Sequence, residues 1–375
     1  MNKTKMILRR LLRLFLPMVL VGIILICCGQ VQREKLGANA NRVYVRAEIT
    51  DIPEDYSTEE FVGHQRVTAV VTRGEHKGKI CDLQNPNTYH LGAYGNEGTR
   101  IIALITGELE DGTLTGSVLN HDRTPMVYLL LGLFGLVTVL VGGKKGLATL
   151  CALAFTFLCV ICMYIPLLYV GCNGILAAVL TSMTILAASI YILNGWSVKT
   201  LCAVIGTTLG VAISGILAMV IGGSFRLSGY NMVEVENMVA IANASRLRVS
   251  DMLYAGVLIS SLGAVMDVSV SVVAAMDEVR QHSPNLSRKE LFASGMRVGK
   301  DMIGTMSNTL ILAYTGSATG LIMNAYAYEI PYLRLMGDNE IIIEILCGLC
   351  GTMGVILTVP LQAAINVLFF AKKKK

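Results

Sequence analysis

The chain is dominated by apolar segments that are long enough to cross the hydrocarbon of a membrane. A helix needs roughly 20 residues to span about 30 Å of hydrocarbon. We place eight such segments, one near the start of the chain and the others at 126–141, 147–170, 175–193, 201–222, 252–275, 303–325 and 341–370. Of the 375 residues, 54% are hydrophobic and only 15% are charged, a balance that a water-soluble fold does not need. The sequence therefore predicts a polytopic α-helical membrane protein with about eight transmembrane helices.

Residues 31–124 differ in character from the apolar segments. They are polar and rich in glycine, and apolar residues alternate with polar ones in "RVYVRAEI", "QRVTAVVT", "TRIIALIT" and "GTLTGSVL". This alternation, broken by "RGEHKGK", "NPN", "YGNEG" and "EDG", predicts several antiparallel strands joined by tight turns. We therefore expect a membrane anchor at 1–30, a small extracytoplasmic β-barrel or sandwich at 31–124, and a seven-helix membrane domain at 125–375.

Basic residues predict which side of the membrane each loop faces. Lys and Arg are enriched on the cytoplasmic side, and here they precede the first predicted span and follow the second, fourth, sixth and eighth. If the spans alternate, these positions all fall on one side, with both termini in the cytoplasm and residues 31–124 outside. Because "ANA" at 38–40 is too distant to serve as a cleavage site, an uncleaved anchor is favoured over a cleaved signal.

One apolar segment contains a carboxylate close to its centre. In "LGAVMDVSVSVV", Asp267 has no basic residue near it in the sequence. Counting by three and four residues places Ser260, Gly263, Asp267 and Ser271 on one face of a helix, which continues toward Glu278. The opposite positions are apolar. We expect the small, polar face to contact protein or water and not lipid.

The following segment carries a second, less complete polar face. Asp301, Thr305 and Asn308 recur at helical spacing with Thr309 beside them, and Leu312 interrupts the series. Two consecutive spans of this kind, joined by an amphipathic link at 278–301, predict neighbouring helices whose polar faces pack together. The polar residues of both faces form the candidate site.

An ionised aspartate at the centre of a bilayer costs at least ~3 kcal/mol. Protonation removes that cost, and so does pairing with a cation or with neighbouring polar groups. A carboxyl that takes up and releases a charge suits a proton or cation relay. The alternative interpretation makes Asp267 a structural hydrogen-bonding group between two helices. Gln362, Asn366, Gly206 and Gly210 are expected to serve helix packing.

Two long motifs carry a resemblance to a known family. "AGVLISSLGAVMDVSVSVVAAMDEV", followed by "GMRVGKDMIGTMSNTLILAYTGS", resembles the paired signature of the YibE/F-like family of bacterial multipass membrane proteins. "GGKKGL", "GCNGIL" and "VPLQAAI" extend the resemblance over most of the chain. The resemblance implies a protein of the bacterial cytoplasmic membrane with one anchor, an outer domain and seven further spans, and it implies no particular reaction.

A more distant likeness concerns mechanism. "GAVMD" has the Gly-x-x-x-Asp form found in the relay helix of the RND permease superfamily, which includes SecD and SecF. The likeness implies a relay role for Asp267, with Asn308 and Thr309 as polar partners. Because RND-type units work in pairs, it also implies a homodimer or a paired membrane subunit. The chain departs from that pattern in its eight predicted spans, where six are usual, and in its small outer domain.

These features favour an ion-coupled transporter driven by protons, or an energising subunit of one, with an unknown substrate. A non-transporting scaffold whose outer β domain binds an envelope component is the alternative. An intramembrane aspartyl protease using Asp267 and Asp301 is disfavoured because Asp301 is shallow and no GxGD form occurs.

All five histidines lie in predicted water-facing segments and no phosphate-binding loop occurs. We therefore expect no enzyme activity, no metal and no cofactor. The expected partners are membrane lipids and a second membrane subunit, and no nucleic acid.

Overall fold

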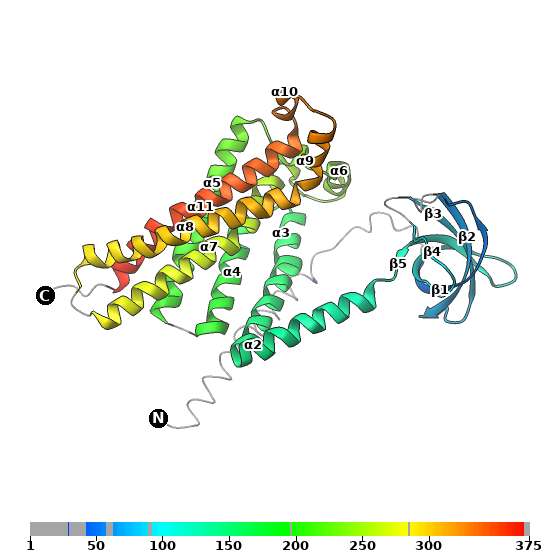
Figure 1. Ribbon diagram of the computed structural model, residues 1–375, viewed down its shortest axis with the longest axis horizontal. Coiled ribbons are helices and arrows are strands. Elements are labelled where there is room, and N and C mark those ends of the chain that lie inside the picture. Colours follow the sequence, from blue (N-terminus) through cyan, green and yellow to red (C-terminus); the bar gives the residue numbers. More distant parts are fainter. Residues whose placement is uncertain are drawn as a thin grey trace, which may run out of the picture. The chain divides into compact units, whose positions relative to one another are not determined.

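The computed structural model describes residue 29 and residues 43–57, 63–88, 92–195, 197–283 and 286–370 (Figure 1). Apart from residue 29, the predicted anchor at 1–30 lies outside the described residues. The chain divides into two compact units, one within residues 35–140 and the other formed from residue 141 onward. The first unit holds all the described strands and the second holds most of the helices.

The first unit contains a closed five-stranded barrel, which confirms the β-rich prediction. Its strands are β1 (Val43–Asp55), β2 (Gly63–Arg73), β3 (Ile80–Asn87), β4 (Arg100–Glu108) and β5 (Leu114–His121). They follow the order β1-β2-β3-β5-β4, and β1 pairs with β4 to close the barrel. This order, with β3 parallel to β5, is that of the OB-fold, a five-stranded Greek-key barrel. The expectation of purely antiparallel strands was wrong at that one pair.

Strand β3 is the element that sequence patterning missed. Its inward positions are Cys81, Leu83, Asn85 and Asn87, so polar residues occupy half of a buried face and the apolar alternation is lost. Asn85 is satisfied inside the barrel, since its amide donates to the Gln65 side chain at 2.9 Å and to the Ala93 carbonyl at 3.0 Å. The "NPN" segment that predicted a turn is therefore the end of a strand.

The Cys81 thiol provides a reporter of barrel folding. Its side chain is fully buried, and burial raises its pKa to about 11. Only roughly one thiol in a thousand is then ionised at pH 8, against about one in four for a free cysteine. We expect a maleimide to leave Cys81 unmodified in the folded protein and to modify it within minutes in denaturant, as measured by peptide mass spectrometry. Equal labelling rates in both conditions would contradict the buried position.

The helical part begins with α2 (Thr124–Cys159), which runs into the π-helix η1 (Val160–Tyr164) and α3 (Ile165–Tyr169). Gly143 interrupts α2 with φ +54° and ψ −130°, a conformation that glycine adopts without a steric penalty. The interruption falls between the predicted spans 126–141 and 147–170. One long apolar helix is thus broken into two parts where two spans were expected.

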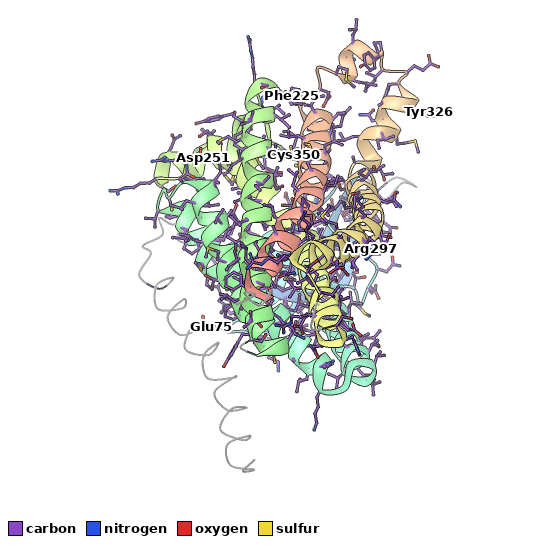
Figure 2. The ribbon with its side chains drawn as sticks, turned by 90° about the vertical axis from the view of Figure 1, so that its left-hand side faces the viewer. Glu75, Phe225, Asp251, Arg297, Tyr326 and Cys350 are labelled. Carbon is purple, nitrogen blue, oxygen red and sulfur yellow. The ribbon has the colours of Figure 1, made fainter. Side chains whose placement is uncertain are left out.

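The remaining helices are α4 (Gly174–Asn194), α5 (Val198–Ser224), η2 (Gly229–Asn231), α6 (Val235–Ala244), α7 (Val249–His282), α8 (Arg288–Ser317), α9 (Thr319–Ala327), α10 (Tyr332–Leu335) and α11 (Asn339–Phe370). Helix α7 packs against α4, α5, α8 and α11. Figure 2 shows Phe225, Asp251 and Tyr326 toward one end of this unit and Arg297 nearer the other.

Five of the described helical segments are long and apolar enough to cross a membrane. They are Thr124–Tyr169, Gly174–Leu193, Val198–Ser224, Val249–His282 and Asn339–Phe369. The eight predicted spans are not confirmed. The first lies outside the described residues, the next two fall within the single segment Thr124–Tyr169, and the predicted span 303–325 is divided between α8 and α9. Helix α8 is not among the five, because its first half is charged and polar residues continue along it.

The predicted amphipathic link at 278–301 is formed by the end of one helix and the start of the next. Helix α7 continues to His282 and α8 begins at Arg288, so most of the link is helical. Ser287 caps α8, since its hydroxyl accepts from the Glu290 backbone while the Glu290 carboxylate accepts from the Ser287 backbone. This capping box satisfies two backbone donors at the helix start, and it allows α8 to begin well before its apolar part.

Candidate functional site

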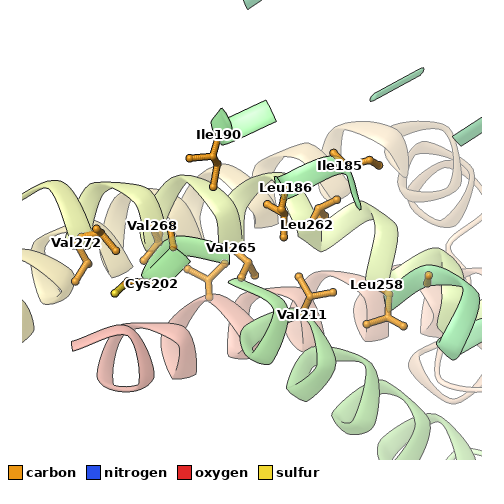
Figure 3. Close-up of a cluster of buried hydrophobic side chains, with 14 of the residues drawn as sticks. Ile185, Leu186, Ile190, Cys202, Val211, Leu258, Leu262, Val265, Val268 and Val272 are labelled. Atoms are coloured by element: carbon orange, nitrogen blue, oxygen red, sulfur yellow. The ribbon is translucent and has the colours of Figure 1, made fainter. Parts of the chain in front are cut away.

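The core of the helical unit lies on one side of α7. Leu258, Leu262, Val265, Val268 and Val272 of this helix are buried. They meet α4 through Ile185, Leu186 and Ile190 and α5 through Cys202 and Val211 (Figure 3). Close van der Waals packing of this β-branched and leucine face against several helices is the main favourable contribution. The packing therefore fixes which face of α7 points outward.

The predicted polar stripe is that outward face. Ser260, Gly263 and Asp267 are exposed and Ser271 is half-buried. The same line continues through Ala274 and Glu278, which are also exposed. The grouping of these residues on one helix face, predicted from their spacing, is what the structure shows.

Asp267 has no partner in the described part of the chain: neither a hydrogen bond nor an ion pair holds its carboxylate there. A Cβ added at Gly263, one turn away, would meet nothing within 4 Å, so the surface beside the acid is open. The carboxyl is neither sealed in a dry contact nor tied to a single neighbour.

The polar residues of α8 do not reach the α7 stripe. Asp301, Thr305, Asn308 and Thr309 are all exposed. The Thr305 hydroxyl donates to the Met302 carbonyl at 3.0 Å and the Thr309 hydroxyl to the Thr305 carbonyl at 2.9 Å. Both bonds stay within the helix. The expectation that the two polar faces pack against each other is therefore wrong, although α7 and α8 are neighbours as predicted.

Apolar contacts explain why the polar faces point outward. Helix α8 packs through small residues: a Cβ at Gly295 would lie 2.4 Å from the Met276 sulfur of α7, and one at Gly299 would lie 2.1 Å from Val359 of α11. Met302, Ile303, Met306 and Leu310 pack onto the same core. Close packing of these small and apolar side chains holds this face in the interior, and the polar face is left outside.

A hydrogen bond links α8 to the α7 stripe. The Tyr314 hydroxyl donates to the Ser260 hydroxyl oxygen at 2.7 Å. Tyr314 also lines an apolar cavity of about 420 Å³ between α8, α9, α10 and α11, which includes the Glu344 carboxyl. The Ser317 hydroxyl lies 3.4 Å from that carboxylate. The sequence patterns did not predict this cavity.

A buried polar cluster holds α5, α7 and α11 together. The Gln362 amide donates to the Cys202 carbonyl at 3.1 Å and to the Asn366 side chain at 3.0 Å. The Ser269 hydroxyl lies 2.5 Å from the Gln362 side-chain oxygen. Gly206 faces this amide, since a Cβ there would fall 1.6 Å from the same oxygen. The packing roles predicted for Gln362, Asn366 and Gly206 are confirmed.

Asp277 is a charged residue that sequence analysis missed. Its carboxylate is 1% exposed and forms ion pairs with Lys199 of α5 and, at 2.7 Å, with Arg280 of its own helix. The Gln281 amide donates to it at 2.5 Å. Lys199 is the only clue in the sequence, because it is the one charged residue in the first turn of α5. Its separation from Asp277 by 78 positions gives no indication that the two meet.

The described residues hold no group of three or more His, Cys, Asp or Glu side chains arranged to bind a metal ion. His64 and His121 lie on barrel strands, His76 in a turn and His282 at the end of α7, whereas His90 is outside the described residues.

The fold and site together define a class: helical proteins with several helices long and apolar enough to cross a membrane, one of them carrying an open carboxylate, and a small β-barrel near the start of the chain. Within that class, the chain belongs to the YibE/F-like protein family, whose model matches residues 130–372. The match covers the helical part and leaves out the barrel. No curated protein and no solved structure matches the chain.

Proposed function

We propose that this protein is a multipass protein of the bacterial cytoplasmic membrane that works as a proton-coupled transporter, or as an energising subunit of one, with Asp267 as the relay acid. In this proposal the chain has an anchor at 1–30, an outer domain at 31–124 and a membrane domain at 125–375. It has eight spans and both termini are cytoplasmic. Its substrate is undefined, and the chain itself needs no cofactor and catalyses no bond-breaking reaction.

The observation that carries the proposal is the unpartnered Asp267 carboxyl on the open face of an apolar helix. An acid at this depth avoids the cost of ionisation in hydrocarbon only by binding a proton, a cation or a polar partner. None of the described residues supplies the partner. Ser260, Gly263 and Ser271 beside it are small, so water or an ion has room to approach. Such a group suits reversible protonation.

The open polar faces also support pairing with a second membrane element. Both the α7 stripe and the α8 residues Asp301, Thr305, Asn308 and Thr309 are exposed, and hydrocarbon is a poor environment for them. A homodimer or a paired membrane subunit would cover these faces and enclose the relay acid. Small residues such as Gly256, Ser260 and Gly263 permit a neighbouring helix to approach closely.

Charged residues support the proposed orientation. Lys199 begins α5, Arg280 lies near the end of α7 and Arg288 begins α8. The Lys199–Asp277 ion pair brings the start of α5 beside the end of α7. Basic residues from separate segments thus gather at one end of the helical unit, as the positive-inside rule expects of a cytoplasmic side.

The proposal predicts selective modification of Asp267 by dicyclohexylcarbodiimide, an apolar reagent that reacts with protonated carboxyl groups in membranes. In native membranes we expect mass spectrometry to find the adduct on the peptide that contains Asp267. Labelling should fall as the pH is raised from about 5 to about 9, because the reagent needs the protonated acid. The Asp267→Asn variant should lose the adduct.

Two controls separate a relay from a packing role. Asp301→Asn should leave labelling of Asp267 unchanged. In cells, Asp267→Glu should restore whatever phenotype a deletion produces, whereas Asp267→Asn, which keeps the shape and hydrogen-bonding ability, should not. An Asn variant that complements fully would reject the relay and leave Asp267 as a structural group.

The scaffold alternative is favoured by one observation on the barrel. A polar cavity of about 530 Å³ is lined by residues of all five strands, among them His64 and Arg66 of β2 and Asp82 of β3, and strands β2 and β3 belong to the face where OB-folds bind ligands. If a secreted form of residues 31–124 alone complemented a deletion, this alternative would replace the transporter. The protease alternative has no comparable support, since no contact joins Asp267 and Asp301 in the described chain.

A further inference from the structure

The first unit contains a charged cavity where the barrel meets the start of α2. Its volume is about 300 Å³. It combines three guanidinium groups with two carboxylates, which leaves one positive charge in excess. The residues that matter are Arg46, Arg73, Arg100, Glu48, Asp122 and Tyr128.

The two carboxylates position two of the arginines without saturating them. Arg46 Nε lies 3.7 Å from Asp122, and Arg100 Nε lies 3.7 Å from Glu48. These ion pairs are too long to be hydrogen bonds. Asp122 is itself fixed by the Thr124 backbone N–H, which donates to it at 3.0 Å. Hydrogen bonds from the Thr124 hydroxyl and backbone, with the charges of Arg46 and Arg100, hold the pKa of Asp122 below its usual value. Arg46 Nη2 also donates to the Thr124 hydroxyl at 3.5 Å, and the other guanidinium N–H groups of Arg46 and Arg100 have no hydrogen-bond acceptor on a described side chain, so they are available to a ligand.

Arg73 supplies the uncompensated charge. It lies directly opposite Arg46 in the β1–β2 ladder, and its side chain has no carboxylate partner among the residues that the structure describes. Two like charges on adjacent strands repel each other. An anion placed between them would relieve that repulsion.

The cavity lies at the level where the hydrocarbon of a membrane would begin. From Met126 onward α2 is apolar, and Met126, Leu129 and Leu133 are 70%, 67% and 55% exposed. Such a helix is stable only in an apolar medium. Thr124 and Pro125, which line the cavity, then lie at the headgroup level. Tyr128 is an amphipathic side chain of the kind enriched at this boundary.

We propose that this cavity binds the phosphate of an anionic phospholipid in the adjacent leaflet, with the acyl chains lying along the first turns of α2. The planar guanidinium fork matches the oxygens of a phosphate. Arg73 and Arg46 hold the phosphate while Tyr128 contacts the glycerol end of the lipid. The site anchors the barrel to the membrane surface. It does not depend on Asp267 or on transport.

Native mass spectrometry of the full-length protein in detergent, with phosphatidylglycerol added in steps, tests the proposal. We expect a saturable first lipid whose affinity falls roughly tenfold in Arg73→Gln, because one charge-assisted contact of the guanidinium is lost. Arg73→Lys should fall between the two, since it keeps the charge and loses the fork. Lys79→Gln, at a cation paired with Glu108 elsewhere on the barrel and outside both barrel cavities, should bind as the wild type does.

Three further results decide the outcome. Phosphatidylcholine should bind more weakly than phosphatidylglycerol, and inorganic phosphate more weakly still. Equal affinity for inorganic phosphate would show a free-anion site and overturn the lipid assignment. Unchanged lipid binding in both Arg73 variants, with Cys81 still protected from maleimide as proof of a folded barrel, would overturn the site itself.

Discussion

Replacing Lys199 and Arg280 together by methionine is expected to destabilise the helical unit by about 3 kcal/mol. The two substitutions leave the Asp277 carboxylate, which is 1% exposed, with the Gln281 amide as its remaining partner among the described residues. An uncompensated buried charge is strongly destabilising, whereas losing one of the two partly exposed cations leaves the other in place. Lys199→Met alone should therefore cost about 1 kcal/mol or less. Circular dichroism during thermal unfolding in detergent measures both effects.

A rescue variant identifies the cause. Adding Asp277→Asn to the double variant removes the buried charge and keeps the side-chain shape. We expect the triple variant to recover most of the lost stability. A triple variant no more stable than the double one would show that the lysine and arginine act through packing of their aliphatic stems.

Introducing a methyl group at Gly206 is expected to have a comparable effect. In Gly206→Ala the new Cβ would lie 1.6 Å from the Gln362 oxygen and 2.5 Å from its amide carbon, so Gln362 has to move. The move breaks its bonds to Cys202, Asn366 and Ser269. Overpacking costs about 1–3 kcal/mol, and each buried polar group left unpaired adds roughly 1–3 kcal/mol. We expect a loss of about 3 kcal/mol or more in the same thermal experiment.

A double-mutant cycle tests this explanation. Gly206→Ala combined with Gln362→Ala removes the clash, so the combined loss should be smaller than the sum of the single losses by about 1 kcal/mol or more. Gly223→Ala is the matched control, because a Cβ at that position of the same helix meets nothing within 4 Å. Its effect should stay within about 0.5 kcal/mol. Additive losses in the cycle would mean that Gly206 and Gln362 do not contact each other.

Patterns of apolar and polar residues over short stretches of the sequence predicted most of the secondary structure. Alternation identified β1, β2, β4 and β5, and apolar length identified α4, α5, α7 and α11. Strand β3 was missed because Asn85 and Asn87 occupy inward positions, and only a partner such as Gln65 makes that acceptable. The start of helix α8 was not predicted, because the Ser287–Glu290 capping box lets the helix begin in a charged segment.

The candidate site likewise has features that the sequence predicted and features that it did not. Helical spacing was enough to group Ser260, Gly263, Asp267 and Ser271 on one face. Which neighbour that face meets depends on contacts between segments far apart in the chain, and here the apolar face of α7 takes the interior and leaves the acid outside. The Asp277–Lys199 pair could not be predicted for the same reason: each residue alone looks like a charge near a helix end.

The sequence by itself determined which segments of this protein are apolar, where apolar and polar residues alternate along a strand, and which residues share a helix face. These features follow from the periodicity of residues along one element. The tertiary structure alone decided that β3 closes the barrel beside β5, that Asp277 is the buried acid, and that Asp267 is the open one. Those outcomes depend on how closely each helix or strand can pack against its neighbours. That quantity is set by the whole packing arrangement and by no single segment.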